Sequence, residues 1–88
     1  MKVRLLDLDR GGEVEVEISP EASLLELIER LKAVGALSAR EAAVVGVTAD
    51  GRTVAYVPAA NVAQLAAYSN QIRAALAFRR FPLHGSNR

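Results

Sequence analysis

The acidic side chains of the N-terminal half come closest, in type and spacing, to a catalytic or metal-binding set. Glu13, Glu15 and Glu17 occupy every second position, whereas a paired-carboxylate mechanism needs two acids over one concave site with pKa values pushed apart. Alternation places all three on one solvated face of a strand. Asp7 and Asp9 flank a strand end and could bind a cation, yet no third oxygen ligand follows at a metal-binding spacing. We therefore interpret these acids as a solvated strand face and a solvated loop.

The other side chains capable of chemistry form no motif. The 88 residues contain no cysteine, which excludes a disulfide framework, a thiolate zinc site and a cysteine nucleophile. The single histidine, His84, has no serine, acid or metal ligand at a motif spacing. Gly11-Gly12 lacks the Lys-Ser/Thr pair that completes a phosphate-binding loop. The sequence therefore predicts no catalytic residue, no metal site, no cofactor and no enzyme activity.

Arginines dominate the charge of the C-terminal part. The whole chain carries a net charge of +1, but residues 52–88 contain five arginines and no acid. Arginine pairs with phosphate and recurs at protein interfaces, although helix macrodipoles and solvated tails also favour it. Exposed phenylalanines are costly without a partner, so docking to a protein is favoured over contact with a DNA backbone. The candidate contact residues are Arg73, Phe78, Arg79, Arg80, Phe81 and Arg88.

The composition is that of one ordinary globular domain. Hydrophobic residues make up 51% of the chain and charged residues 24%, which separates it from disordered sequences. No apolar run is long enough to span a bilayer, so we expect no membrane contact. The start of the chain leads into a strand pattern and not into a signal peptide, which predicts a cytoplasmic location. We expect a single domain over residues 1–80 and an aperiodic C-terminal tail over 81–88.

The N-terminal half predicts a hairpin followed by a helix. Residues 2–8 and 13–18 read as strands, and Gly11-Gly12 suits the loop between them. A helix can begin at Ser19-Pro20 or at Ser23, which has the capping-box spacing to Glu26. Gly35 is expected to end this helix with a left-handed cap. Its apolar stripe consists of Leu24, Leu27, Ile28, Leu31 and Val34.

The C-terminal half predicts a second hairpin and a second helix. Residues 43–48 and 53–57 are rich in strand formers and flank a turn at Asp50, Gly51 and Arg52. Asn61 is a natural N-cap for a helix that the spacing of apolar residues extends to about Arg79. The resulting order, β-β-α-β-β-α, predicts an α+β domain in which two hairpins pack against two helices.

Residues 44–80 resemble the lambda W-type head-completion (head–tail joining) proteins of tailed phages. The resemblance lies in Val47-x-x-Asp50-Gly51-Arg52-x-Val54-x-Tyr56, in Val62-x-x-Leu65-x-x-Tyr68 and in the arginines that follow. It implies a structural docking protein of the virion that forms a homo-oligomeric ring under the portal and meets portal or tail components. Asp50, Gly51 and Arg52 would then form the hairpin tip, and Arg79, Arg80 and the tail would reach a neighbour or the DNA channel.

The N-terminal half is similar to the β-β-α opening of ubiquitin-like β-grasp domains. The similarity covers Met1 to Leu5, the glycine loop, Val14 to Ile18 and the helix that begins near Ser23. Where that fold needs a closing strand, the sequence predicts an alanine-rich helix, and the C-terminal Gly-Gly used for conjugation is absent. This resemblance implies the alternative function, a β-grasp-like adaptor or accessory subunit that binds a protein partner through its sheet edge.

Overall fold

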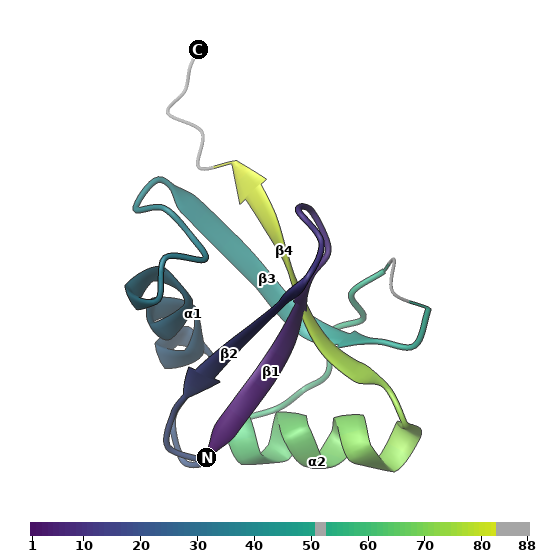
Figure 1. The fold of residues 1–88 in the computed structure, drawn as a ribbon. Coiled ribbons are helices and arrows are strands. Elements are labelled where there is room, and N and C mark those ends of the chain that lie inside the picture. Colours follow the sequence, from purple (N-terminus) through teal and green to yellow (C-terminus); the bar gives the residue numbers. More distant parts are fainter. Residues whose placement is uncertain (51–52, 83–88) are drawn as a thin grey trace.

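The computed structural model describes residues 1–50 and 53–82 and has an α+β architecture. In chain order its elements are β1 (Lys2–Asp7), β2 (Glu13–Glu17), α1 (Leu24–Ala33), β3 (Glu41–Thr48), α2 (Val62–Ile72) and β4 (Ala75–Pro82). The four strands form one mixed sheet in the order β2-β1-β4-β3 (Figure 1). β4 runs parallel to β1 and antiparallel to β3, so it occupies the middle of the sheet.

The predicted N-terminal hairpin is confirmed. β1 and β2 pair antiparallel, with Val3 opposite Val16. Gly11 and Gly12 in the connecting loop have φ values of 80° and 84°, in the left-handed region that glycine adopts without steric cost. Because successive side chains alternate, the valines of the two strands face the core and the glutamates of β2 face solvent.

Side-chain and backbone caps fix the ends of α1. Of the two starts that the sequence allows, the structure has the later one, in which the Glu26 N–H donates to Ser23 Oγ at 3.2 Å. Gly35, with φ of 84°, ends the helix in the expected left-handed conformation. Leu27 and Leu31 of the predicted apolar stripe are fully buried against the sheet.

The second predicted hairpin is reduced to a single bridge. The sequence predicts a strand over 53–57, but in that segment only Ala55 pairs with β3, through two backbone hydrogen bonds to Val47 of 2.9 and 3.2 Å. Pro58 follows closely and has no N–H with which to extend the ladder. The segment therefore crosses the end of β3 without adding a fifth strand.

The predicted hairpin tip is described at one residue, since Gly51 and Arg52 lie outside the described residues. Asp50 Oδ1 accepts hydrogen bonds from Thr48 Oγ1 at 2.9 Å and from the Thr53 N–H at 3.2 Å. This short-range pattern is how aspartate commonly stabilises a turn.

The second helix is shorter than predicted, and a strand follows it. Its start is as expected, because the Gln64 N–H donates to Asn61 Oδ1 at 2.9 Å. The predicted end near Arg79 is wrong, since α2 ends at Ile72 and Arg73 takes a left-handed conformation with φ of 55°. Residues 75–82 then form β4, so the observed order is β-β-α-β-α-β. Of the tail expected over 81–88, residues 81–82 belong to β4 and the rest lie outside the described residues.

Burial explains why β4 forms in place of more helix. Leu76 and Phe78 alternate with outward-facing residues and have exposed fractions of 8% and 0%. A helix over the same residues would point these two side chains 200° apart around its axis, whereas a strand delivers both to one face. Tertiary packing therefore overrides the helical preference of the alanines around them.

The core lies between the sheet and α1, and α2 closes its end (Figure 1). Val62 and Leu65 of α2 are fully buried in the same cluster as the leucines of α1. The first N–H groups of α2 lack partners within the helix and instead donate to the loop before α1, from Val62 to Ala22 O at 2.9 Å and from Ala63 to Pro20 O at 2.9 Å. These bonds anchor the start of α2 to the loop that precedes α1.

The two phenylalanines of β4 should contribute very differently to stability. We expect Phe78→Ala to lower the free energy of unfolding by about 4 kcal/mol, because it leaves a cavity in the core. Phe81→Ala should lower it by less than about 1 kcal/mol, because this ring is 42% exposed. Urea denaturation followed by circular dichroism measures both, and Phe78→Leu serves as a milder variant if the alanine variant does not fold. A similar decrease in the free energy of unfolding for both alanine variants would contradict the observed orientation of β4, with Phe78 in the core and Phe81 on the outer face.

Candidate protein-docking surface

The two faces of β4 separate the contact residues predicted from the sequence. Phe78 pairs with Val45 and points inward, where it is fully buried. Its expected role as a contact residue is therefore corrected, since its ring cannot reach a partner in the folded domain. Arg79 and Phe81 point to the opposite, outer face, beside Val44 and Ala42 of β3 respectively.

Arg80 points inward and is the centre of an ionic network. Its Nη1 donates to Asp7 Oδ1 at 2.6 Å and its Nη2 to Asp7 Oδ2 at 2.8 Å, a bidentate pair. Nη2 also donates to Ala36 O at 2.5 Å, and the Arg80 N–H donates to Asp9 Oδ2 at 2.5 Å. The side chains of Arg80 and Asp7 are 10% and 7% exposed. The expected contact of Arg80 with a partner or with DNA is corrected, because its guanidinium is engaged inside the fold.

Asp7 organises the β1–β2 loop around this network. Its Oδ1 accepts hydrogen bonds from the N–H groups of Asp9 at 3.1 Å and Arg10 at 3.0 Å. The hydrogen bonds from Arg80 hold the pKa of Asp7 below its ordinary value of 3.8 although burial opposes them, and the backbone bonds act in the same direction. Of the two acids considered for cation binding, Asp7 thus binds the Arg80 guanidinium, and Asp9 accepts from the Arg80 N–H and lies 3.9 Å from its Nη1. No group of three or more His, Cys, Asp or Glu suited to a metal occurs among residues 1–50 and 53–82.

Glu41 extends the network to the loop between α1 and β3. Its Oε2 accepts from the Ser38 N–H at 2.6 Å, and its Oε1 lies 3.2 Å from Arg10 Nη2 and 3.6 Å from Arg80 Nε. The bond from Ser38 is the main reason that the pKa of Glu41 is lowered. Arg80 also lies over the Phe78 ring, with its Cζ 5.2 Å from the ring centroid. The β1–β2 loop, the loop between α1 and β3, and the end of β4 are therefore tied to one guanidinium.

Among the described residues, Arg73 lies apart from the predicted contact residues on the outer face. Arg73 caps the end of α2 and is exposed there, before the start of β4. Arg79 lies further along β4 on the outer face. Arg88 lies outside the described residues. Of the predicted set, Arg79 and Phe81 are thus brought together on one surface.

Apolar side chains surround Arg79 on the outer face of the sheet. Leu8, whose N–H donates to Phe78 O at 3.2 Å, continues the alternation of β1 toward this face. Its neighbours from β1 and β3 are partly exposed, and Phe81 is 42% exposed. We call this surface the outer-face patch, and it consists of Leu6, Leu8, Ala42, Val44, Arg79 and Phe81.

Residues 54–55 limit the patch on the side of β3. A Cβ atom at Gly46 would lie 2.4 Å from Ala55 O and 2.5 Å from Val54 Cγ1, so only glycine allows this segment to approach the strand. Ala77, opposite Gly46, is fully buried. The segment that was predicted as a strand therefore covers part of the outer face and leaves the patch beside it.

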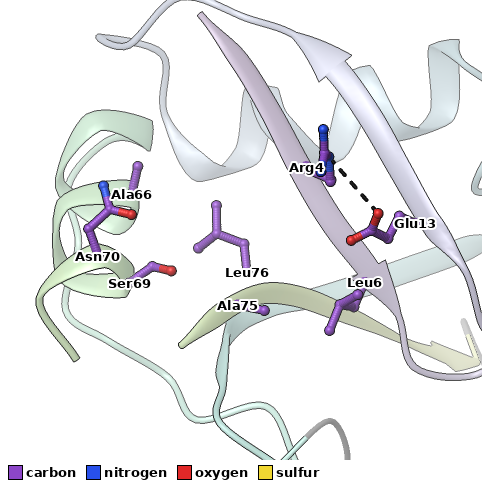
Figure 2. Close-up of a pocket in the computed structure, with 8 residues that line it drawn as sticks. All are labelled: Arg4, Leu6, Glu13, Ala66, Ser69, Asn70, Ala75 and Leu76. Atoms are coloured by element: carbon purple, nitrogen blue, oxygen red, sulfur yellow. Dashed lines mark ion pairs between the residues drawn. The ribbon is translucent and has the colours of Figure 1, made fainter. Parts of the chain in front are cut away.

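A pocket of about 240 Å³ borders the patch on the side of α2 (Figure 2). Leu6 belongs to both the patch and the pocket wall. The pocket is lined by Arg4, Leu6, Glu13, Ala66, Ser69, Asn70, Ala75 and Leu76.

Sequence reasoning missed the pairing of Asp7 with Arg80. The two residues are 73 positions apart, so no local spacing links them. One signal was available in the sequence. Leu76, Phe78 and Arg80 are spaced two residues apart, as on one face of a strand. In such a strand the adjacent residues Arg79 and Arg80 must face opposite sides, so one of them would point inward. The aliphatic members of the outer-face patch were also missed, because they come from β1, the residue after it and β3, and the sequence does not state that β4 lies between these strands.

Comparisons of this chain with protein-family models, with curated proteins and with solved structures find no significant match. Within residues 1–50 and 53–82, neither helix has the length and apolarity to cross a bilayer.

The Asp7–Arg80 pair should make stability depend on acid pH. Because the pKa of Asp7 in the fold is below its ordinary value of 3.8, its contribution is complete above that value and is lost as the pH falls through the lowered pKa. We expect Asp7→Asn to cost about 3 kcal/mol near neutral pH and much less near pH 2. Urea denaturation at both pH values measures the difference. Glu29→Gln, an exposed control, should change stability by less than about 0.5 kcal/mol, and a pH-independent Asp7→Asn effect would contradict the assignment.

Proposed function

We propose that this chain is a non-enzymatic docking module of the ubiquitin-like β-grasp type, which binds a protein partner through the outer-face patch. The observation that carries the proposal is an exposed aromatic residue and an arginine set among aliphatic side chains on one open sheet face. The β-grasp assignment is supported by β4, which supplies the closing strand that the β-β-α opening of that fold requires. Fold alone does not determine function, so the argument for docking rests on the surface.

The residue types of the patch are those that protein interfaces favour. Aromatic residues and arginine are enriched in interface cores, and they carry much of the binding energy there. The chain contains only two phenylalanines, of which Phe78 is in the core and Phe81 is on the outer face. A ring left 42% exposed beside other apolar side chains gains burial when a partner covers it.

The charge within the patch indicates the partner's chemistry. Arg79 is exposed on the outer face, opposite Val44 in the β-sheet ladder. A partner that places a carboxylate at Arg79 and apolar side chains over Phe81 would match both features, because arginine pairs with carboxylates in a fixed bidentate geometry. The proposed partner surface is therefore apolar with an acidic group near its centre.

Head–tail joining is a second candidate, favoured by the exposed side of α2. Tyr68 and Ile72 lie one helical turn apart and are 40% and 44% exposed. A ring of copies needs such a second surface on each subunit, in addition to the one that meets the portal or tail. This candidate function comes from the resemblance over residues 44–80 and adds assembly of this chain with itself.

Replacing Phe81 should weaken partner binding without unfolding the domain. A photo-reactive phenylalanine analogue at position 81, introduced in the native cells, should crosslink the partner, which is then purified. We expect Phe81→Ala to weaken binding of that partner by about 30-fold, as at an interface hot spot. Arg79→Ala should weaken it by about tenfold and make it less sensitive to salt. Isothermal titration calorimetry measures these affinities.

Tyr56 provides the matched control, because it is 72% exposed and lies on the segment outside the patch. Tyr56→Ala should change the affinity by less than about threefold, and the analogue at position 56 should not capture the same protein. Unchanged affinity for the Phe81→Ala variant would show that the patch does not bind the partner.

The joining candidate is tested by the oligomeric state of the chain. It predicts ring-sized assemblies in native mass spectrometry, alone or with the portal protein. Tyr68→Ala together with Ile72→Ala should shift these assemblies to monomer, because the exposed face of α2 loses its apolar contacts. A monomer at all accessible concentrations that never binds a portal would argue against joining and leave the adaptor function.

A further inference from the structure

The pocket beside the outer-face patch has an apolar floor. Leu6 of β1 and Leu76 of β4 lie toward the middle of the view in Figure 2, with Ala75 next to them and Ala66 across from them on α2. These side chains offer no hydrogen-bonding group, so the floor suits the methylene stem of a side chain. The volume of about 240 Å³ admits one large side chain.

Negative charge prevails beside the mouth of the pocket, where Glu13 is a lining residue and Glu15, the next outward residue of β2, lies just outside the lining. Arg4 is the one cation that lines it, and Arg4 Nε lies 4.0 Å from Glu13 Oε1 while its Nη2 lies 3.7 Å from Glu15 Oε2. Two carboxylates therefore share one guanidinium. The Glu13 contact is at the outer limit of an ion pair, so Glu13 can turn to a second cation while Glu15 still neutralises Arg4.

Polar groups of α2 stand across the pocket from Glu13 (Figure 2). The Ser69 hydroxyl is engaged, because it donates to Ala74 O within the fold. Asn70, one residue further, is exposed, and its amide oxygen is a hydrogen-bond acceptor. A carboxylate on one side and an amide oxygen on the other can both accept from a cationic donor.

We propose that this pocket takes a lysine or arginine side chain of the partner protein. The methylene stem lies over Leu6, Ala75 and Leu76, and the cationic head lies between the Glu13 carboxylate and Asn70. An anion is disfavoured at this mouth, because Glu13 lines it and Arg4, the one guanidinium there, already pairs with Glu15 beside the pocket. The inference rests on the proposed docking function, since Leu6 belongs to both the pocket and the outer-face patch. It adds a basic side chain to the partner surface, next to the acidic and apolar groups proposed to cover Arg79 and Phe81.

Small-molecule probes test the pocket without the partner. The full chain, labelled with ¹⁵N, is titrated with Nα-acetyl-arginine methylamide, with the leucine analogue and with the glutamate analogue. We expect the arginine probe to shift the amide signals of Leu6, Ala66, Asn70 and Ala75 with millimolar affinity, at least about fivefold tighter than the leucine probe. Tighter binding of the glutamate probe, or equal binding of the arginine and leucine probes, would overturn the proposal.

Two glutamates of β2 give a matched pair of variants. Glu13→Gln should weaken the arginine probe by about fivefold. Glu17→Gln should leave it unchanged, because Glu17 lies on the same strand face but pairs with the N-terminal amine at 2.7 Å and does not line the pocket. Ala66→Leu should fill the pocket and abolish binding of every probe while the rest of the spectrum is retained. Equal effects of the two glutamine variants would overturn the proposal.

The outcomes separate this inference from the proposed function. If the arginine probe does not bind but Phe81→Ala still weakens the partner, the pocket proposal fails and docking through the patch remains. If the probe binds at the pocket and Phe81→Ala leaves partner affinity unchanged, the proposal of docking through the patch fails. The pocket would then bind a cationic side chain, but not one of a partner that covers the patch.

Discussion

The pair between Asp7 and Arg80 connects the two ends of the described chain. A buried guanidinium is costly unless it is paired, and here Asp7 accepts from both Nη atoms in bidentate geometry, Ala36 O accepts another bond, and Nε, which has no hydrogen bond, lies 3.6 Å from Glu41 Oε1. The same carboxylate holds the β1–β2 loop through two backbone N–H groups. The interaction therefore fixes strand position as well as charge, because β1 and β4 must run side by side in one register for these atoms to meet.

Register at β4 decides which residues are available to a partner. Arg79 and Arg80 are adjacent, so a shift of one residue would exchange their faces and would also expose Phe78. Only the observed register gives the inward arginine a carboxylate and places the bulky ring of Phe78 in the core. The outer-face patch is thus a consequence of an interaction on the opposite side of the sheet. The backbone under the patch is held by the hydrogen bonds of the sheet, and a surface that is ordered before binding loses less entropy if a partner covers it.

The parts of the fold that follow from local patterns could be predicted. The first hairpin follows from its glycines and alternating valines, and the caps at Ser23, Gly35 and Asn61 follow from side-chain chemistry within a few residues. The second hairpin was overpredicted, because strand formers over 53–57 indicate only a propensity, and Pro58, which lacks an N–H, cannot extend the single bridge into a ladder.

The site was harder to predict than the fold, because it depends on contacts between distant residues. Helix propensity of alanines hid β4, whose strand period is visible only at Leu76, Phe78 and Arg80. As a result the six predicted contact residues were treated as one cluster, whereas an alternating strand divides Phe78 and Arg80 from Arg79 and Phe81. Composition shows that residues 52–88 are basic and acid-free, but only strand geometry shows which of their side chains face out.

The central place of β4 also constrains how this domain can fold during synthesis. β1, β2 and α1 leave the ribosome first, yet β4, which lies beside β1 on the side opposite β2, is the last element of the described chain to be made. Until then the edge of β1 that pairs with β4 has no neighbouring strand, and the apolar side of α1 faces an incomplete sheet. The sheet can therefore be completed only after nearly the whole described domain has been made. Before that, a chaperone or a neighbouring chain can pair with the open edge of β1.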